Sequence, residues 1–221
     1  MRLPHGYRNQ TFVVRPGVVE KRYVGPDPEL RQRVELAALR YLGQILPVPC
    51  VLNHGLGWTQ LELVVGRSAQ DEIEGDQPDD VLRLTGRLLR HVHAVDTTPL
   101  ADVLPGTGRV LVHGDFGVQN IVVAGKPPHV SGLLDWEFAH LGDPLEDLAW
   151  AEWIVRMHHP TRRHALRSLF DAYGSMPAWG ERHHAMLALC AVQCARAERD
   201  RDPRTLARWE ERTRLTEVWL E

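Results

Sequence analysis

His-Gly-Asp-Phe-Gly-Val-Gln-Asn at residues 113–120 and Leu-Asp-Trp-Glu at residues 134–137 carry most of the information in this sequence. Asp115 and Asn120 lie in a loop between two apolar, strand-like runs, and Asp135 lies at the end of the next such run. Oxygen-bearing side chains at strand ends can converge on one point. We therefore expect Asp115, Asn120 and Asp135 to form one site.

These residue types suit phosphoryl transfer. Mg²⁺ takes hard oxygen ligands and binds through one or two carboxylates together with nucleotide phosphates, which suits Asp135 and Asn120. A carboxylate kept off the metal, Asp115, can accept the hydrogen of an attacking hydroxyl and hold it in line with the γ-phosphoryl group. The structural alternative is that Asp115 forms a turn after Gly114 and Asn120 caps a turn or helix.

Lysine is rare in this chain, and one of its two lysines lies inside an apolar strand. Of 26 basic residues only Lys21 and Lys126 are lysines. Lys21 lies in the run Val-Val-Glu-Lys-Arg-Tyr-Val of residues 18–24, where an ammonium without an anionic partner would be costly. A phosphate and an acidic side chain would supply that partner. The alternative is an edge strand from which the lysine reaches solvent.

Turn and cap signals divide the first 65 residues into strands around one helix. Pro16-Gly17 joins predicted strands at residues 11–15 and 18–24 into a β-hairpin. Asp27-Pro28 predicts an N-cap and the first position of a helix that ends at Gly43. Two further strands are predicted at residues 48–52 and 58–65.

The remainder is predicted to be mainly helical. A helix is expected at residues 81–95, short strands at 109–112, 121–123 and 130–134, and helices from Asp143 onward with breaks near Pro160, Pro177 and Pro203. Between Gly66 and the first of these helices, residues 71–80 hold six acids and no base, which is typical of a linker, a pocket rim or a capped helix start.

The two segments quoted first, together with Gly142-Asp143-Pro144-Leu-Glu-Asp147, resemble the catalytic and metal-binding segments of the aminoglycoside phosphotransferase family. The resemblance covers about the first 150 residues. It implies an α+β, bilobal, protein-kinase-like fold, with a small β-rich N-terminal lobe at residues 1–65 and a mainly helical C-terminal catalytic and acceptor-binding lobe at residues 66–221. The chain is a short member, because the stretch between hinge and catalytic loop is reduced.

The same resemblance implies roles for further residues. Residues 6–14 are similar to the family's nucleotide loop, Lys21 to its phosphate-binding lysine, and Glu35 to the glutamate that pairs with that lysine. Residues 61–66 resemble the interlobe hinge, where the Glu62 carbonyl and the Val64 amide would bind adenine. Asp115 would then be the catalytic base, with Asn120 and Asp135 as Mg²⁺ ligands.

The resemblance also implies that Asp147 braces the catalytic loop through its backbone. Asp143 with Pro144 predicts an N-cap for the helix that follows. Glu137, two residues after Asp135, is a candidate contact for a second metal or for the substrate.

The predicted function is that of a small-molecule kinase that transfers the γ-phosphoryl group of ATP or GTP to a hydroxyl of an antibiotic, amino sugar or similar metabolite. The alternative is a catalytically inactive kinase-like protein that binds a nucleotide or a partner. If the acceptor is a polycation, the acids of residues 71–80 with Glu137, Glu146 and Glu152 are the candidates to hold it in a shallow pocket. The alternative for the acidic run is a solvated surface.

Composition excludes other classes. A net charge of −3 argues against a nucleic-acid partner, and no apolar run approaches the roughly 20 residues of a membrane helix. Three sparse cysteines and an N-terminus without an apolar core predict a cytoplasmic protein. Adjacent or alternate histidine pairs do not have the spacing of a helical zinc site. We expect a monomer by default.

Overall fold

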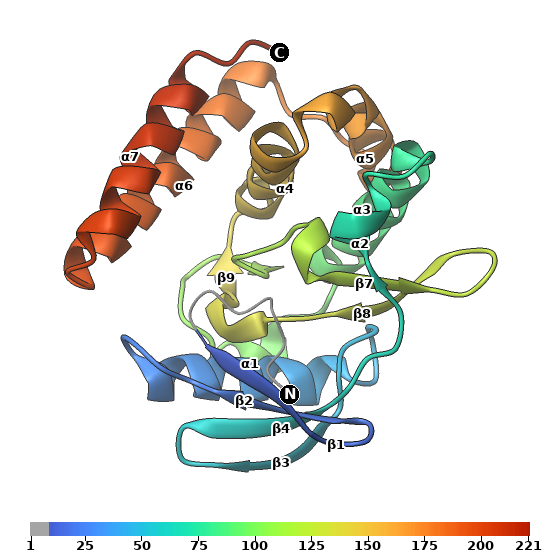
Figure 1. The fold of residues 1–221 in the computed structure, drawn as a ribbon, viewed down its shortest axis with the longest axis vertical. Coiled ribbons are helices and arrows are strands. Elements are labelled where there is room, and N and C mark those ends of the chain that lie inside the picture. Colours follow the sequence, from blue (N-terminus) through green and yellow to red (C-terminus); the bar gives the residue numbers. More distant parts are fainter. Residues whose placement is uncertain (1–8) are drawn as a thin grey trace.

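In the computed structural model, which describes residues 9–221, a β-rich lobe lies below a mainly helical one (Figure 1). The first three residues of the expected nucleotide loop, Gly6 to Arg8, lie outside the described residues. The β-rich lobe consists of β1 (Gln10–Arg15), β2 (Val18–Arg22), α1 (Pro28–Leu42), β3 (Val51–Gly55) and β4 (Trp58–Glu62). The expectation of a bilobal α+β fold is confirmed.

The strands of the β-rich lobe form one antiparallel sheet in the order β1-β2-β4-β3. Gly17 turns the β1–β2 hairpin with a φ of 74°, a conformation that glycine adopts without steric cost. Val19 and Leu61 are paired across β2 and β4 and face the core together with Val34 of α1. This packing places the helix that carries Glu35 against the sheet that carries Lys21.

Two local expectations in this lobe need correction. The strand predicted at 48–52 begins at Val51, because Pro47 and Pro49 have no N–H group to donate to a ladder. Asp27 occupies the N-cap position of α1, but its side chain makes no capping hydrogen bond; its backbone is left-handed (φ 49°) and its carboxylate pairs with Arg199 at 3.0 Å. The sheet ends at Glu62, so the lobe boundary at residues 65 and 66 stays a prediction.

The second lobe contains small sheets and most of the helices. Its strands are β5 (Arg67–Ser68), β6 (Val110–Val112), β7 (Ile121–Ala124), β8 (His129–Leu133) and β9 (His140–Gly142). Its α-helices are α2 (Ala69–Glu72), α3 (Pro78–His93), α4 (Pro144–His158), α5 (Leu166–Tyr173), α6 (Trp179–Arg199) and α7 (Pro203–Glu217), with 3₁₀ turns η1 (Thr98–Leu100), η2 (Val118–Asn120), η3 (Trp136–Phe138) and η4 (Pro160–Ala165).

Strand pairing explains why the polar residues of the two quoted segments meet. β7 and β8 pair antiparallel with Ile121 opposite Leu133, so the residue before β7 lies beside the residue after β8. The Leu134 amide donates to the Asn120 carbonyl at 2.8 Å. Asn120 and Asp135 are therefore held at the same end of the β7–β8 strand pair, as the strand-end argument predicts.

The lobes are joined through a buried contact between α1 and η3. Trp136 of η3 is fully buried in the same hydrophobic core as Val34 and Ala38 of α1. The Trp136 backbone amide donates to Glu35 Oε1 at 3.2 Å. The helix of the first lobe is thus fixed directly against the segment that carries Asp135.

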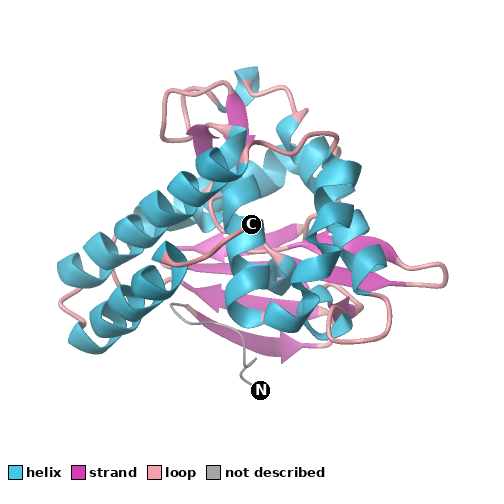
Figure 2. Cartoon of the chain, turned by 90° about the horizontal axis from the view of Figure 1, so that it is seen from above, coloured by secondary structure: helices cyan, strands magenta, loops and turns pink. Residues whose placement is uncertain are grey.

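α6 and α7 form an antiparallel helical hairpin beside α4 (Figures 1 and 2). Trp153 of α4 is fully buried under it and donates from Nε1 to Thr216 Oγ1 of α7 at 2.9 Å. Arg182 of α6 is also buried and pairs with Glu152 of α4 at 2.5 Å. These contacts hold the hairpin as a wall of the helical lobe.

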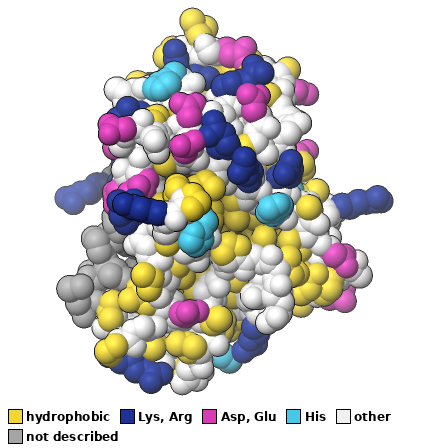
Figure 3. Space-filling view, turned by 90° about the vertical axis from the view of Figure 1, so that its right-hand side faces the viewer, with side chains coloured by type: hydrophobic (Ala, Val, Ile, Leu, Met, Phe, Trp, Pro, Cys, Tyr) yellow, Lys and Arg dark blue, Asp and Glu magenta, His cyan; other side chains and the backbone are white. Residues whose placement is uncertain are grey.

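The surface shows mixed charge. On the face drawn in Figure 3, basic and acidic side chains alternate over the upper part, and hydrophobic side chains gather below them. Within residues 9–221, none of the helices has the length and apolar character that crossing a membrane requires.

Close packing of α3 on α5 depends on Gly86. A Cβ added there would collide with the Leu169 backbone carbonyl of α5, whereas a Cβ at Gly180 of α6 would meet no atom within 4 Å. Gly86→Ala should therefore lower the free energy of unfolding by about 1–3 kcal/mol, measured by urea denaturation. Gly180→Ala is the matched control, and it should be neutral or stabilising by up to about 1 kcal/mol. Equal effects of the two substitutions would contradict this packing.

Candidate active site

Lys21 is buried between acidic groups from both lobes. Its side chain is only 4% exposed, and Nζ lies 2.8 Å from Glu35 Oε2 and 2.8 Å from Asp135 Oδ1. Tyr23 donates its hydroxyl hydrogen to Glu35 Oε2 at 2.6 Å. Burial works against the charged ammonium, but the surrounding carboxylates of Asp135 and Glu35 outweigh it and raise the pKa of Lys21. The edge-strand alternative, with Lys21 in solvent, is excluded.

Asp135 follows β8 in a strained backbone conformation. Its φ is 62° and its ψ 58°, in the left-handed region that residues other than glycine rarely adopt. Its side chain is 43% exposed and lines a cleft between the lobes. Burial would raise the pKa of Asp135, but the Lys21 ammonium beside it lowers the pKa overall, so the carboxylate is ionised. Strained, charged residues of this kind occur at functional sites.

Glu137 is held by two residues whose roles the sequence did not suggest. Its Oε2 accepts from Asn9 Nδ2 at 2.6 Å and from the Arg31 guanidinium at 3.1 Å, and it lies 3.6 Å from Lys21 Nζ. Glu137 is 6% exposed. Its carboxylate thus balances a buried arginine as well as facing the cleft. The one available signal was that Arg31 precedes Glu35 by four residues, on the same face of α1.

Asp147 fixes the loop that carries Asp115. Its carboxylate accepts from the backbone amides of His113 at 2.7 Å and Gly114 at 3.0 Å, which confirms the predicted bracing role. His113 is buried, donates from Nε2 to the Leu134 carbonyl and accepts from the Asp115 amide at Nδ1, so it is occupied in the loop. Gly114 has a φ of 78°, and a Cβ there would collide with the Phe138 carbonyl. Asp143 caps α4 as predicted, accepting from the amide of Leu145 at 2.8 Å.

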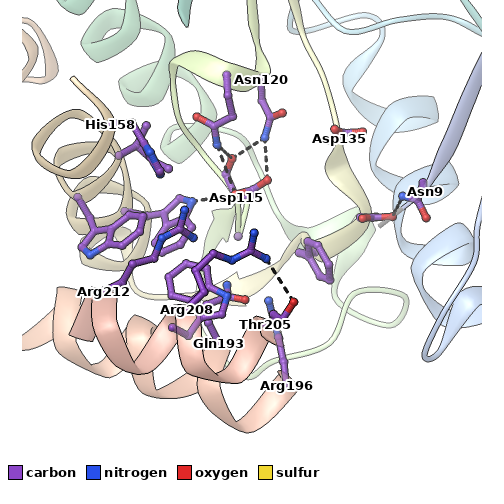
Figure 4. A pocket seen from close by; sticks show the side chains of 18 of the residues that line it. Asn9, Asp115, Asn120, Asp135, His158, Gln193, Arg196, Thr205, Arg208 and Arg212 are labelled. Atoms are coloured by element: carbon purple, nitrogen blue, oxygen red, sulfur yellow. Dashed lines mark hydrogen bonds between the residues drawn. The ribbon is translucent and has the colours of Figure 1, made fainter. Parts of the chain in front are cut away.

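Asp115 receives hydrogen bonds on both carboxylate oxygens (Figure 4). Asn120 Nδ2 donates to Oδ2 at 3.0 Å and to the Asp115 carbonyl at 2.7 Å, and Trp150 Nε1 of α4 donates to Oδ1 at 2.8 Å. Desolvation raises the pKa of Asp115 to about 6, although both donors lower it. A base with a pKa slightly below neutrality is mostly ionised at pH 7 and still basic enough to accept a proton. No sequence motif indicates a role for Trp150.

The donor set fits Mg²⁺ bound together with a nucleotide. Asp135 offers an ionised carboxylate to the cleft. The Asn120 amide nitrogen is turned to Asp115, and Figure 4 shows its oxygen on the side of Asp135. Within residues 9–221 no cluster of three or more His, Cys, Asp or Glu side chains is arranged to hold a metal. One carboxylate and one amide need phosphate oxygens to complete the shell, which is the usual arrangement for Mg²⁺.

The site opens into one cleft of about 560 Å³ that reaches from Lys21 to the α6–α7 hairpin. This volume is in the range of small-molecule sites. The expectation that the acceptor part of the cleft is shallow stays a prediction. α4, α6 and α7 supply the far wall, with Trp150, Trp153 and Trp209 among the lining residues. Glu62 and Val64 of the expected hinge are not among them, and their contacts with adenine stay a prediction.

The acidic run of residues 71–80 lies outside this cleft. The carboxylates of Glu72, Glu74 and Asp80 pair with arginine or histidine side chains of the helical lobe, Asp79 accepts from Ser168, and Asp71 and Asp76 are exposed. Part of the run forms α2 and part the first turn of α3. The hypothesis that these acids hold a polycationic acceptor is therefore wrong. On the surface, these carboxylates are paired, hydrogen-bonded or exposed to solvent.

Sequence and fold comparisons agree with this geometry. The model of a family described as the phosphotransferase enzyme family matches residues 99–187, a span that includes Asp115, Asn120, Asp135 and Asp147. The resemblance to the aminoglycoside phosphotransferase family, with its kinase-like fold, is confirmed.

Individual proteins show the same likeness over different lengths. The chain is 42% identical to viomycin phosphotransferase of Streptomyces vinaceus over 50 residues, which is 22% of this chain and 17% of that protein. It is 51% identical to human acyl-CoA dehydrogenase family member 11 over 39 residues, 18% of this chain and 5% of that protein. The matched segments thus span less than a fifth of these curated relatives.

Solved structures extend the likeness to the whole fold. The GDP complex of wild-type aminoglycoside 2'-phosphotransferase-IIIa aligns with a TM-score of 0.79 at 14% identity, covering 98% of this chain and 91% of that one. Aminoglycoside phosphotransferase APH(4)-Ia aligns with a TM-score of 0.71 at 18% identity, covering 98% and 92%. At these identities the alignments show the fold.

The geometry predicts different phenotypes for the two aspartates. Asp115→Asn keeps the shape of the side chain but replaces one accepting oxygen with an NH2 group and removes the proton acceptor, so phosphoryl transfer should fall about 10²–10⁴-fold while Mg-nucleotide affinity is kept. Asp135→Asn should weaken Mg²⁺-dependent nucleotide affinity, because an amide is a poorer ligand than a carboxylate. Calorimetric titration and single-turnover rates separate these effects. Exchanged phenotypes would mean that the two roles are reversed.

Asp115 should also set the acidic limb of the pH–rate profile. With a pKa of about 6, kcat/KM should fall as pH drops through 6, because the protonated base cannot accept the hydroxyl hydrogen. Trp150→Phe removes a hydrogen bond that lowers this pKa, so the limb should move to higher pH. Trp179→Phe at the start of α6 is the control. An unmoved limb in Trp150→Phe would contradict the assignment of Asp115 as base.

Proposed function

We propose that the chain is a Mg²⁺-dependent kinase that transfers the γ-phosphoryl group of ATP or GTP to a hydroxyl of a small molecule. The observation that carries this proposal is that one cleft holds two carboxylates in different electrostatic surroundings. Asp135 is held by a lysine and is ionised, whereas Asp115 is held by neutral donors and has a raised pKa. In phosphoryl transfer, a Mg²⁺ ligand has to be ionised and a general base has to be able to accept a proton, and these two environments suit those two roles.

Asp115 is the residue that handles the proton. The acceptor oxygen forms a bond to the γ-phosphorus, the bond from the γ-phosphorus to the β–γ bridging oxygen breaks, and the acceptor hydrogen passes to Asp115. The nucleoside diphosphate leaves with the bridging oxygen. Asn120 and Trp150 hold the carboxylate still throughout, which limits the reorganisation that transfer requires.

Lys21 and Glu35 prepare the phosphate side. Lys21 has three N–H donors, and in this structure they face Glu35 and Asp135. A bound triphosphate gives the ammonium a further anionic partner while Glu35 keeps it in place. Asp135 and Asn120 are the residues that would hold Mg²⁺, which supplies neutralisation of the phosphate charge. The relatives with GDP in their structures support a nucleotide at this position.

The reaction class is better supported than any one acceptor. Relatives in complex with kanamycin and gentamicin support transfer to a hydroxyl-bearing molecule. An antibiotic or amino sugar was expected to be held by the acidic run, and that run lies outside the cleft. The groups that hold the acceptor are therefore those of the cleft wall itself.

The test is nucleotide turnover with the two lysines as a matched pair. Lys21→Ala should weaken Mg-ATP and Mg-GTP binding and turnover by at least about tenfold, because a charge-assisted hydrogen bond to phosphate is lost. Lys126→Ala, in the exposed turn between β7 and β8, should change neither. Binding is measured by calorimetry, and turnover by nucleoside diphosphate release.

The same experiment distinguishes the inactive-scaffold alternative. Nucleotide binding without Mg²⁺-dependent turnover, unaffected by Asp115→Asn, would show a binding protein. Equal behaviour of Lys21→Ala and Lys126→Ala would remove the nucleotide site from this cleft.

A further inference from the structure

The acceptor side of the cleft is lined by arginines. Arg196 of α6 and Arg208 and Arg212 of α7 line the wall across the cleft from Asp115 (Figure 4). The acids that the hairpin adds to this wall, Asp200 and Asp202, both lie in its connecting turn. Asp202 caps α7, accepting from the amides of Arg204 and Thr205. The hairpin therefore presents more positive than negative charge to the cleft.

A continuous row of indole rings connects these arginines with the base. Trp150 donates to Asp115 Oδ1 and stacks on Trp153, with ring centroids 4.8 Å apart and planes 2° apart. Trp209 of α7 lies 5.3 Å from Trp153 and 6.0 Å from Trp150. The Arg212 guanidinium carbon lies 4.7 Å from the centre of the Trp209 ring. A small molecule whose hydroxyl reaches Asp115 therefore lies in the same cleft as the guanidinium groups of Arg208 and Arg212.

The aromatic contacts also orient the cationic groups. Arg212 lies over both Trp209 and Trp153, and Arg196 lies 4.7 Å from the centre of the Phe138 ring. A planar guanidinium group carries its N–H donors in a fork that matches the two oxygens of a carboxylate or phosphate. Arg208 is exposed at the same wall and donates to Thr205 Oγ1 at 3.2 Å.

The state of His158, which also lines the cleft, agrees with a positively charged wall. Burial, with the Arg212 guanidinium next in effect, lowers the pKa of His158 to about 4, so its imidazole is neutral at pH 7. An acceptor ammonium placed here would face three guanidinium groups against the two carboxylates of Asp200 and Asp202, and the 71–80 run adds no carboxylate to this wall. Like charges at a binding wall select against such a ligand.

We propose that the acceptor carries an oxyanion, a carboxylate or a phosphate, in addition to its reacting hydroxyl, and that Arg208 and Arg212 of α7 bind it. The inference rests on the proposed kinase function and names the acceptor class for the same cleft. Bidentate, charge-assisted hydrogen bonds from guanidinium groups orient the molecule, and the partly exposed Trp209 indole contacts its carbon skeleton. The hydroxyl is thereby presented to Asp115.

Four pyranose probes that differ in one substituent test this proposal: glucuronate, glucose 6-phosphate, glucose and glucosamine. Dissociation constants are measured by tryptophan fluorescence with Mg²⁺ and a non-hydrolysable nucleotide present, and phosphoryl transfer is measured with ATP. At least one anionic probe should bind about tenfold or more tightly than glucose, and glucosamine should bind most weakly. Preference for glucuronate identifies a carboxylate site, and preference for glucose 6-phosphate a phosphate site.

Charge reversal locates the site. Arg208→Glu should weaken binding of the preferred anionic probe roughly ten- to a hundredfold and improve that of glucosamine. Arg204→Glu is the matched control, because Arg204 lies on the same helix, is exposed and does not line the cleft. It should leave all four constants unchanged.

The outcomes distinguish failure of the oxyanion site from failure of the kinase function. Nucleotide binding and slow hydrolysis by water are measured without any sugar. If both are present and the probes show no preference for anions, or Arg208→Glu and Arg204→Glu behave alike, the oxyanion proposal is overturned and the kinase function stands. If Mg-nucleotide does not bind at all, the kinase function fails, and the acceptor proposal fails with it.

Discussion

The rest of the structure depends on the burial of one lysine. An ammonium removed from water costs several kcal/mol unless acids surround it. Lys21 meets this requirement with Glu35 from its own lobe and with Asp135 and Glu137 from the other lobe. The four groups therefore hold the two lobes together across the cleft, and Trp136 seals their contact by donating its amide to Glu35. Arg31 supplies the second positive charge that balances three carboxylates. Catalytic potential and interlobe cohesion thus come from the same ion pairs.

The two aspartates of the cleft differ because their neighbours differ. Asp135 faces a full positive charge, and its pKa is lowered; Asp115 faces an amide and an indole, and its pKa is raised to about 6 by desolvation. Neutral donors orient a carboxylate without taking away its basicity as an ammonium would. Asp147 fixes the loop that carries Asp115 by accepting hydrogen bonds from the His113 and Gly114 amides. The loop is thus held in place without a cation next to the Asp115 carboxylate.

Sequence reasoning succeeded where the signal was local or where one motif held the partners. The Pro16-Gly17 hairpin, the Asp143 cap and the convergence of Asn120 with Asp135 all follow from neighbouring residues or from the pairing of adjacent strands. It failed where partners are far apart in the chain. Arg31 and Glu137 are separated by 106 positions, and Trp150 follows Asp115 by 35 positions on a helix whose orientation no pattern encodes. The adenine contacts of Glu62 and Val64 rest on resemblance alone.

The acidic run shows most clearly why composition does not locate charge. Six acids in residues 71–80 suggested a cation site, yet three of them pair with arginines or a histidine of the same lobe and none lines the cleft. No sequence motif marks the C-terminal arginines, yet the α6–α7 hairpin places three of them on the cleft wall. This hairpin forms the wall of the cleft that lies across from Asp115. The sign of the charge on this wall depends on which faces of α6 and α7 pack on α4. Two contacts fix those faces: the hydrogen bond from Trp153 to Thr216 and the ion pair of Arg182 with Glu152.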